Sequence, residues 1–138
     1  MPDWRPKVPL MIAAGRIAFG AGLMASPVAG ARPYLGAEAS RPSVRFMSRI
    51  FGGRDLALGI VLLQALRDER PEAVRRALWL GAGCDAWDAA AALRGRELPV
   101  WGRLMVGATG LTFAGLGAMA ASAPETPPPP GAVGAPTA

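Results

Sequence analysis

Six ionisable residues interrupt apolar stretches of this 138-residue sequence. Their side chains can form ion pairs, and the acidic ones can bind a proton or a cation. The six residues are three arginines and three aspartates: Arg16, Arg54, Asp55, Asp85, Asp88 and Arg103. A charge inside an apolar environment is costly unless an opposite charge neutralises it. Arginine suits this role because its guanidinium carries five N–H donors and can bridge two carboxylates. The sequence therefore predicts one network in which positive and negative charges balance.

Three kinds of chemistry are open to such a network. It can hold helices in register, which is the interpretation that balanced charges favour. Alternatively, one carboxylate that is left partly uncompensated can take and release a proton or cation during transport. Divalent metal binding by Asp55, Asp85 and Asp88 is disfavoured, because three nearby arginines oppose it and the chain has no histidine. We therefore predict no metal, no cofactor and no catalytic site.

The spacing of the charged residues requires partners on different helices. Arg54 and Asp55 are adjacent, so they point in different directions around a helix and cannot fully satisfy each other. Gly52 and Gly53 precede them and remove side-chain bulk beside the pair. Asp85 and Asp88 are three residues apart and therefore share one helix face. All six charges are expected to meet in one half of a helical bundle.

Four apolar segments position these charges. They cover about residues 8–27, 50–66, 73–93 and 100–122, close to the roughly 20 residues that a membrane-spanning helix needs. Only 18% of the residues are charged, against about a quarter in soluble domains. We expect an all-α, antiparallel four-helix transmembrane bundle over residues 1–122, multi-pass in the cytoplasmic membrane with the lipid bilayer as its partner. A soluble helical bundle is the alternative.

Two connecting regions have distinct compositions. Residues 28–40 are expected to form a loop, since they include Pro33 and Gly36. Residues 123–138 are rich in Pro, Ala and Gly and are expected to form a disordered tail.

A basic face precedes the second apolar segment. Arg41, Arg45 and Arg49 recur every four residues, which places them on one side of a helical turn. Arginines at this position are typical of the membrane interface, and a specific lipid or partner site is the alternative. The net charge of +5 has no basic stripe interleaved with aromatic residues, so nucleic acid is not an expected partner. Basic residues flank both ends of the bundle, so the positive-inside rule does not choose an orientation.

Small residues recur every four positions in several segments. Such stripes let helices approach closely, and four helices cannot bury all of them. A second copy of the chain or another membrane protein is therefore a predicted partner. The first stripe is Ala14, Ala18, Gly22 and Ser26, and another is Ala77, Gly81, Asp85 and Ala89.

The chain resembles a widespread bacterial family of small four-helix integral membrane proteins known only as a domain of unknown function. The resemblance covers about residues 11–121, and its most specific element is the second-helix sequence FGGRDLALG. It implies a multi-pass membrane location and no established activity. More loosely, the chain is similar to DoxX-like four-helix membrane proteins. That similarity implies a membrane subunit that partners an oxidoreductase.

Overall fold

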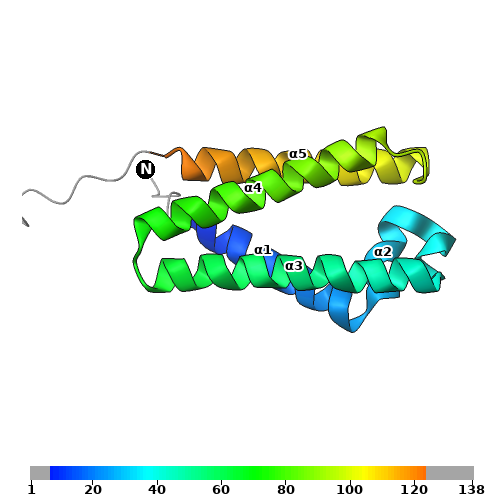
Figure 1. Cartoon of the computed structure of the whole chain (residues 1–138), viewed down its shortest axis with the longest axis horizontal. Helices are drawn as coiled ribbons and strands as arrows, with labels where there is room; N and C mark the ends of the chain where they lie inside the picture. Colours follow the sequence, from blue (N-terminus) through cyan, green and yellow to red (C-terminus); the bar gives the residue numbers. More distant parts are fainter. Residues whose placement is uncertain (1–6, 124–138) are drawn as a thin grey trace, which may run out of the picture.

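The computed structural model describes residues 7–123, which form helices and no strand. The elements are α1 (Lys7–Ala25), α2 (Pro27–Leu35), the 3₁₀ helix η1 (Gly36–Ser40), α3 (Pro42–Arg67), α4 (Pro71–Arg94) and α5 (Val100–Ala121) (Figure 1). The predicted all-α class is confirmed. The tail predicted for 123–138 lies outside the described residues apart from Ala123.

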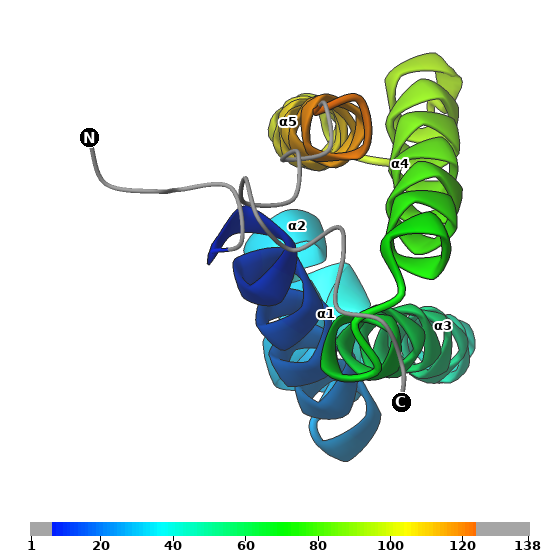
Figure 2. The ribbon, with the colours of Figure 1, turned by 90° about the vertical axis from the view of Figure 1, so that its left-hand side faces the viewer.

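The four long helices α1, α3, α4 and α5 alternate in direction and form two closely packed pairs. Helix α1 packs on α3, and α4 packs on α5. The view along the bundle separates the two pairs (Figure 2). Helix α4 begins beside α3 and diverges from it toward its C-terminal end (Figures 1 and 2). The two pairs therefore meet closely at one end of the bundle and less closely at the end where α2 lies.

Glycines set the close approach of α1 to α3. A Cβ atom on Gly20 would lie 2.5 Å from the carbonyl oxygen of Gly52. A Cβ atom on Gly59 would lie 2.9 Å from the carbonyl oxygen of Ala13. These distances are shorter than a real Cβ contact, so only glycine permits this backbone spacing.

The small-residue stripe predicted on the first helix does not form this contact. Ala14, Ala18, Gly22 and Ser26 are all exposed, and the opposite face of α1 packs against α3. In contrast, Gly81, Asp85 and Ala89 of the stripe on α4 are buried.

The loop predicted for residues 28–40 is wrong, because the segment is helical and adds a fifth α-helix to the expected four. Pro27 occupies the first turn of α2, where a missing N–H is tolerated. Ala31 and Ala39 are buried, at 5% and 0% exposure, against neighbouring helices. This packing overrides the poor helix propensity of a segment that contains Pro33 inside a helix.

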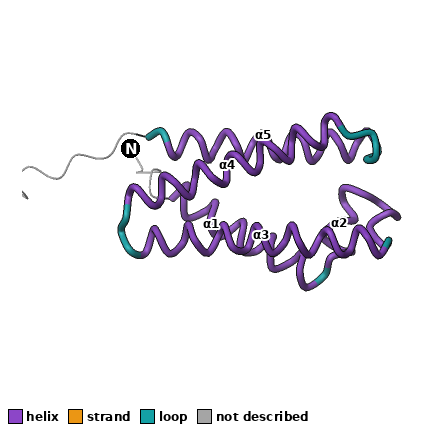
Figure 3. The backbone as a smooth tube through the Cα atoms, in the orientation of Figure 1, coloured by secondary structure: helices purple, strands orange, loops and turns teal. Residues whose placement is uncertain are grey.

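Short turns join α3 to α4 and α4 to α5, whereas α2 and η1 form the connection between α1 and α3 (Figure 3). Pro42 and Pro71 stand in the first turns of α3 and α4, where proline favours a helix start. Helix α3 begins directly after Arg41 and runs without a break through Arg45 and Arg49 into the apolar segment predicted for 50–66. The basic turn and the apolar segment are therefore one continuous helix of 26 residues.

The surface of the bundle exposes many large apolar side chains as well as charged ones. Many large hydrophobic residues are exposed, among them Met11 at 71%, Trp87 at 72% and Val100 at 69%. Two helices, α1 and α5, are long and apolar enough to cross a membrane, and only 33% and 17% of their apolar stretches are buried. Helices α3 and α4 are as long but carry more charged residues. Two of the four predicted spans therefore meet this criterion of length and composition.

Candidate functional site

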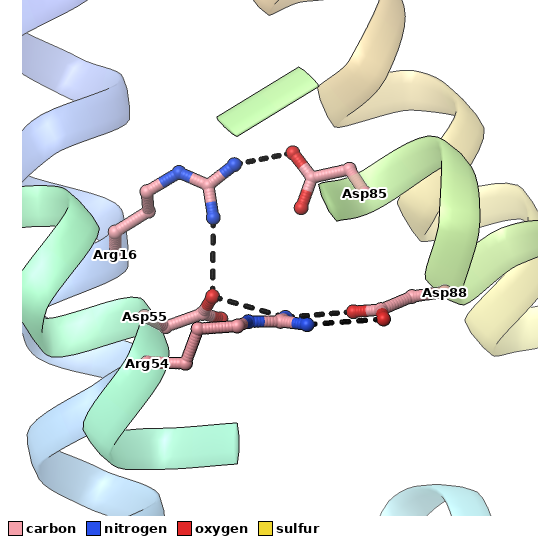
Figure 4. A network of polar contacts seen from close by, with 5 residues as sticks. All are labelled: Arg16, Arg54, Asp55, Asp85 and Asp88. Atoms are coloured by element: carbon pink, nitrogen blue, oxygen red, sulfur yellow. Dashed lines mark hydrogen bonds and ion pairs between the residues drawn. The ribbon is translucent and has the colours of Figure 1, made fainter. Parts of the chain in front are cut away.

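Arg16 ties three helices together at the centre of the bundle (Figure 4). Its side chain projects from α1 and is 8% exposed. Nη1 donates to Asp55 Oδ1 on α3 at 3.1 Å, and Nη2 donates to Asp85 Oδ2 on α4. Gly81 makes room for the guanidinium, since a Cβ there would lie 2.9 Å from Arg16 Nη2. One arginine therefore bridges two buried carboxylates on different helices.

Arg54 forms the second connection across the gap between the helix pairs. It binds Asp88 of α4 in bidentate fashion, with Nη1–Oδ1 at 3.0 Å and Nη2–Oδ2 at 2.7 Å. Nη2 also lies 3.2 Å from Asp55 Oδ1, which thus accepts from both arginines. The guanidinium carbon sits 5.3 Å from the ring centroid of Phe51, one helical turn earlier. The contact between Phe51 and Arg54 could have been predicted from the sequence, because residues three apart on a helix are neighbours.

Arg103 lies outside the network, contrary to the prediction from sequence. Its Nη2 donates to the carbonyl oxygen of Leu93 at 2.7 Å. Leu93 is in the last turn of α4, where carbonyl groups have no partner within the helix. Arg103 lies in the first turn of α5 and donates to one of these acceptors.

Because Arg103 is not part of the network, the charges in the network do not balance as the sequence predicts. The connected set contains two guanidinium groups, of Arg16 and Arg54, and three carboxylates, of Asp55, Asp85 and Asp88. With every group ionised, the network has a net charge of one negative.

The basic face is separate from the network. Arg41 directly precedes α3, and Arg45 and Arg49 lie in its N-terminal part; all three are exposed. Arg41 Nε pairs with Glu38 Oε2 of η1 at 2.7 Å. These residues therefore form an open basic surface at the end of the bundle where α2 lies.

A cavity of about 550 Å³ adjoins the network between the two helix pairs. All five network residues line it, together with apolar and aromatic side chains from every helix. Its apolar wall includes Phe19, Leu23, Leu35, Leu98, Val106 and Phe113. The sequence does not predict this cavity, partly because Tyr34 and Leu35 belong to the segment that is predicted to be a loop. No spacing pattern could have indicated it, since the wall combines five helices and a turn.

The network can act chemically in two ways. It can stabilise the relative positions of the helix pairs, and its excess carboxylate can accept a proton or pair with a cation. Within residues 7–123, no group of three or more acidic, histidine or cysteine side chains is arranged to hold a metal ion.

The fold and the site define a class: small helical proteins with many exposed apolar side chains and a partly buried arginine–aspartate network. The model of one family, the domain of unknown function DUF4267, matches residues 13–125. The chain belongs to this family. No curated protein and no solved structure matches the chain.

Proposed function

We propose that this chain is a multi-pass protein of the cell membrane, with a structural or accessory role, in which α1, α3, α4 and α5 cross the bilayer. The observation that carries the proposal is the inverted distribution of polarity. Arg16, Asp55 and Asp85 are each 8% exposed, whereas Trp87 and Met119 are 72% and 66% exposed. A protein in water buries its large apolar residues, while a protein in lipid turns them outward and pairs its charges inside.

In this role the network stabilises the packing of the α1–α3 pair against the α4–α5 pair. Helix pairs in lipid gain little from apolar contact, because lipid tails are as apolar as the side chains. Arg16 and Arg54 each connect the α1–α3 pair to an aspartate of α4. These ion pairs specify which faces of the two helix pairs meet, at the level of the bundle centre.

Alkaline carbonate extraction tests the membrane location. Membranes from cells that express the full chain are washed with high salt and then with carbonate. We expect the protein to stay in the membrane pellet, because removal of spanning helices from lipid exposes large apolar surfaces to water. Release of the chain into the carbonate supernatant would contradict the proposal.

A proton- or ion-coupled carrier is the second candidate, and the charge imbalance favours it. The network keeps one carboxylate in excess beside a cavity, which is the arrangement that a site for a proton or cation needs.

Asp85→Asn separates the two candidates. If the network is structural, this variant has a lower thermal unfolding midpoint in detergent than the wild type, because Arg16 loses one charged partner. If the protein is a carrier, the variant keeps its midpoint and loses pH-dependent flux in proteoliposomes. Asp68→Asn is the matched control, since Asp68 is exposed and pairs loosely with Arg70 at 3.6 Å.

A further inference from the structure

We infer that the cavity between the helix pairs is a binding site for a lipophilic amine, whose ammonium group pairs with Asp55 and Asp85. The inference goes beyond the proposed function, because it requires the fold of the described residues and not a bilayer. It stands on three features: the charge of the network, the free carboxylate oxygens, and the apolar walls of the cavity.

The charge of the network selects a cation. Among residues 7–123, two guanidinium groups pair with three carboxylates, so the network has one negative charge in excess when every group is ionised. A buried uncompensated charge is strongly unfavourable, and an ammonium group beside it restores neutrality. An anionic ligand would double the imbalance.

The hydrogen-bonding groups of the network favour a ligand that donates hydrogen bonds. Among the described contacts, Asp55 uses only Oδ1 and Asp85 uses only Oδ2. The second carboxylate oxygen of Asp85 lies on the side of the carboxyl group nearer the Arg54–Asp88 pair and makes no contact with the residues drawn (Figure 4). The terminal nitrogens of both arginines already donate to carboxylates. The unpartnered Nε of Arg54 is fully enclosed, so a ligand in the cavity cannot reach it.

The rest of the cavity suits an apolar body. Phe19, Leu23, Val106 and Phe113 line it. The polar side chains on its wall outside the network are those of Tyr34, Ser48, Glu97 and Thr109. Its volume of about 550 Å³ is in the usual range for sites that hold small organic molecules. Such sites are mostly apolar with a few polar groups that orient the ligand, as the network would orient an ammonium group here.

Three ligands with the same chain and different head groups test the inference: decylamine, decanol and decanoate. Radiolabelled decylamine is dialysed at neutral pH against the full chain in dodecyl maltoside, with protein-free micelles in the opposite chamber. Unlabelled ligands then compete for the site. We expect saturable binding of decylamine, with decanol weaker by about tenfold or more because it lacks a charge-assisted hydrogen bond. Decanoate should compete least.

Two tryptophan variants on α5 test the location. Val106 lines the cavity, whereas Val100 is 69% exposed and does not line it. Val106→Trp should weaken decylamine binding by about tenfold or more through steric overlap. Val100→Trp should leave it unchanged. Circular dichroism and gel filtration verify that both variants fold.

Three results would overturn the inference. They are no saturable decylamine binding, displacement by decanol or decanoate as effective as by decylamine, or equal binding by the two tryptophan variants. The head-group comparison uses the wild-type chain, so it decides the chemistry even if Val106→Trp does not fold. A chain that binds decylamine in detergent but leaves membranes in carbonate would retain this site and lose the proposed location.

Discussion

Arg16 makes two ion pairs whose geometry depends on a planar, forked donor. Its two terminal nitrogens point to carboxylates on α3 and α4, and the side chain is 8% exposed. Lysine has the same charge but presents it at a single point, so it cannot reproduce both directed contacts. At the scale of single residues, the shape of the guanidinium therefore matters as much as its charge.

Replacement of Arg16 should destabilise the protein more than replacement of a surface arginine. Arg16→Gln leaves the buried Asp85 without a cation and leaves Asp55 with Arg54 alone, so the expected loss is about 3–5 kcal/mol of unfolding free energy. Arg16→Lys should fall between this variant and the wild type. Thermal unfolding in detergent, followed by circular dichroism, measures the order of the three proteins.

Arg75→Gln is the matched control for this series. Arg75 pairs with Glu72 at 3.1 Å on the surface, where ion pairs contribute about 1 kcal/mol or less. An unfolding midpoint of Arg16→Gln equal to that of Arg75→Gln would show that the network does not stabilise the fold.

At the scale of elements, the contact between α1 and α3 depends on which face of α1 carries the essential glycine. Gly20 faces the backbone of α3, whereas a Cβ on Gly22 would meet nothing within 4 Å. Both residues belong to α1, and only two positions separate them. Gly22 belongs to the exposed stripe of small residues on α1. Self-association of the chain through this stripe stays a prediction from the sequence.

Alanine substitutions at these two glycines should have opposite effects. Gly20→Ala places a methyl group 2.5 Å from backbone atoms of Gly52 and Leu56, so α1 must move away from α3. We expect a loss of about 1–3 kcal/mol, the usual result of overpacking. Gly22→Ala should be neutral or stabilising by up to about 1 kcal/mol, because alanine favours the helix. Equal unfolding midpoints of the two variants in detergent would contradict the packing described here.

At the scale of the whole molecule, the apolar exterior and the charged interior belong to one arrangement. The α1–α3 and α4–α5 pairs are each close-packed, and the network and the cavity lie between them. Trp79, Trp87 and Trp101 are all exposed on the outer surface, at 51%, 72% and 44%. In a bilayer, this surface would be the one that contacts lipid.

Tryptophan fluorescence should therefore respond to lipid. In vesicles of phosphatidylcholine brominated on its acyl chains, we expect lower emission than in unbrominated vesicles, because Trp87 would contact the chains if the helices cross the bilayer as proposed. Trp87→Phe should remove part of this quenching. Unchanged emission in brominated vesicles, together with strong quenching by aqueous acrylamide, would place this surface in water.

The sequence by itself determined the helical class and the presence of charges that need partners. Both follow from local properties: apolar runs long enough for extended helices, and arginine or aspartate residues that interrupt them. The ion-pair partners within the network depended on more than spacing. The pairing of Arg16 with Asp55 and Asp85 depends on helix rotation and separation, which Gly20, Gly59 and Gly81 set through contacts distant in sequence.

Only the tertiary structure decided three features: the hydrogen-bond partner of Arg103, the helical state of residues 27–35 and the existence of the cavity. Arg103 binds an unpaired carbonyl group that exists because α4 ends beside it. Helix α2 forms in a proline-containing segment because neighbouring helices bury Ala31. The wall of the cavity combines residues of all five α-helices and of the turn before α5. Each depends on where one helix lies relative to another, a property that hydropathy and local spacing do not encode.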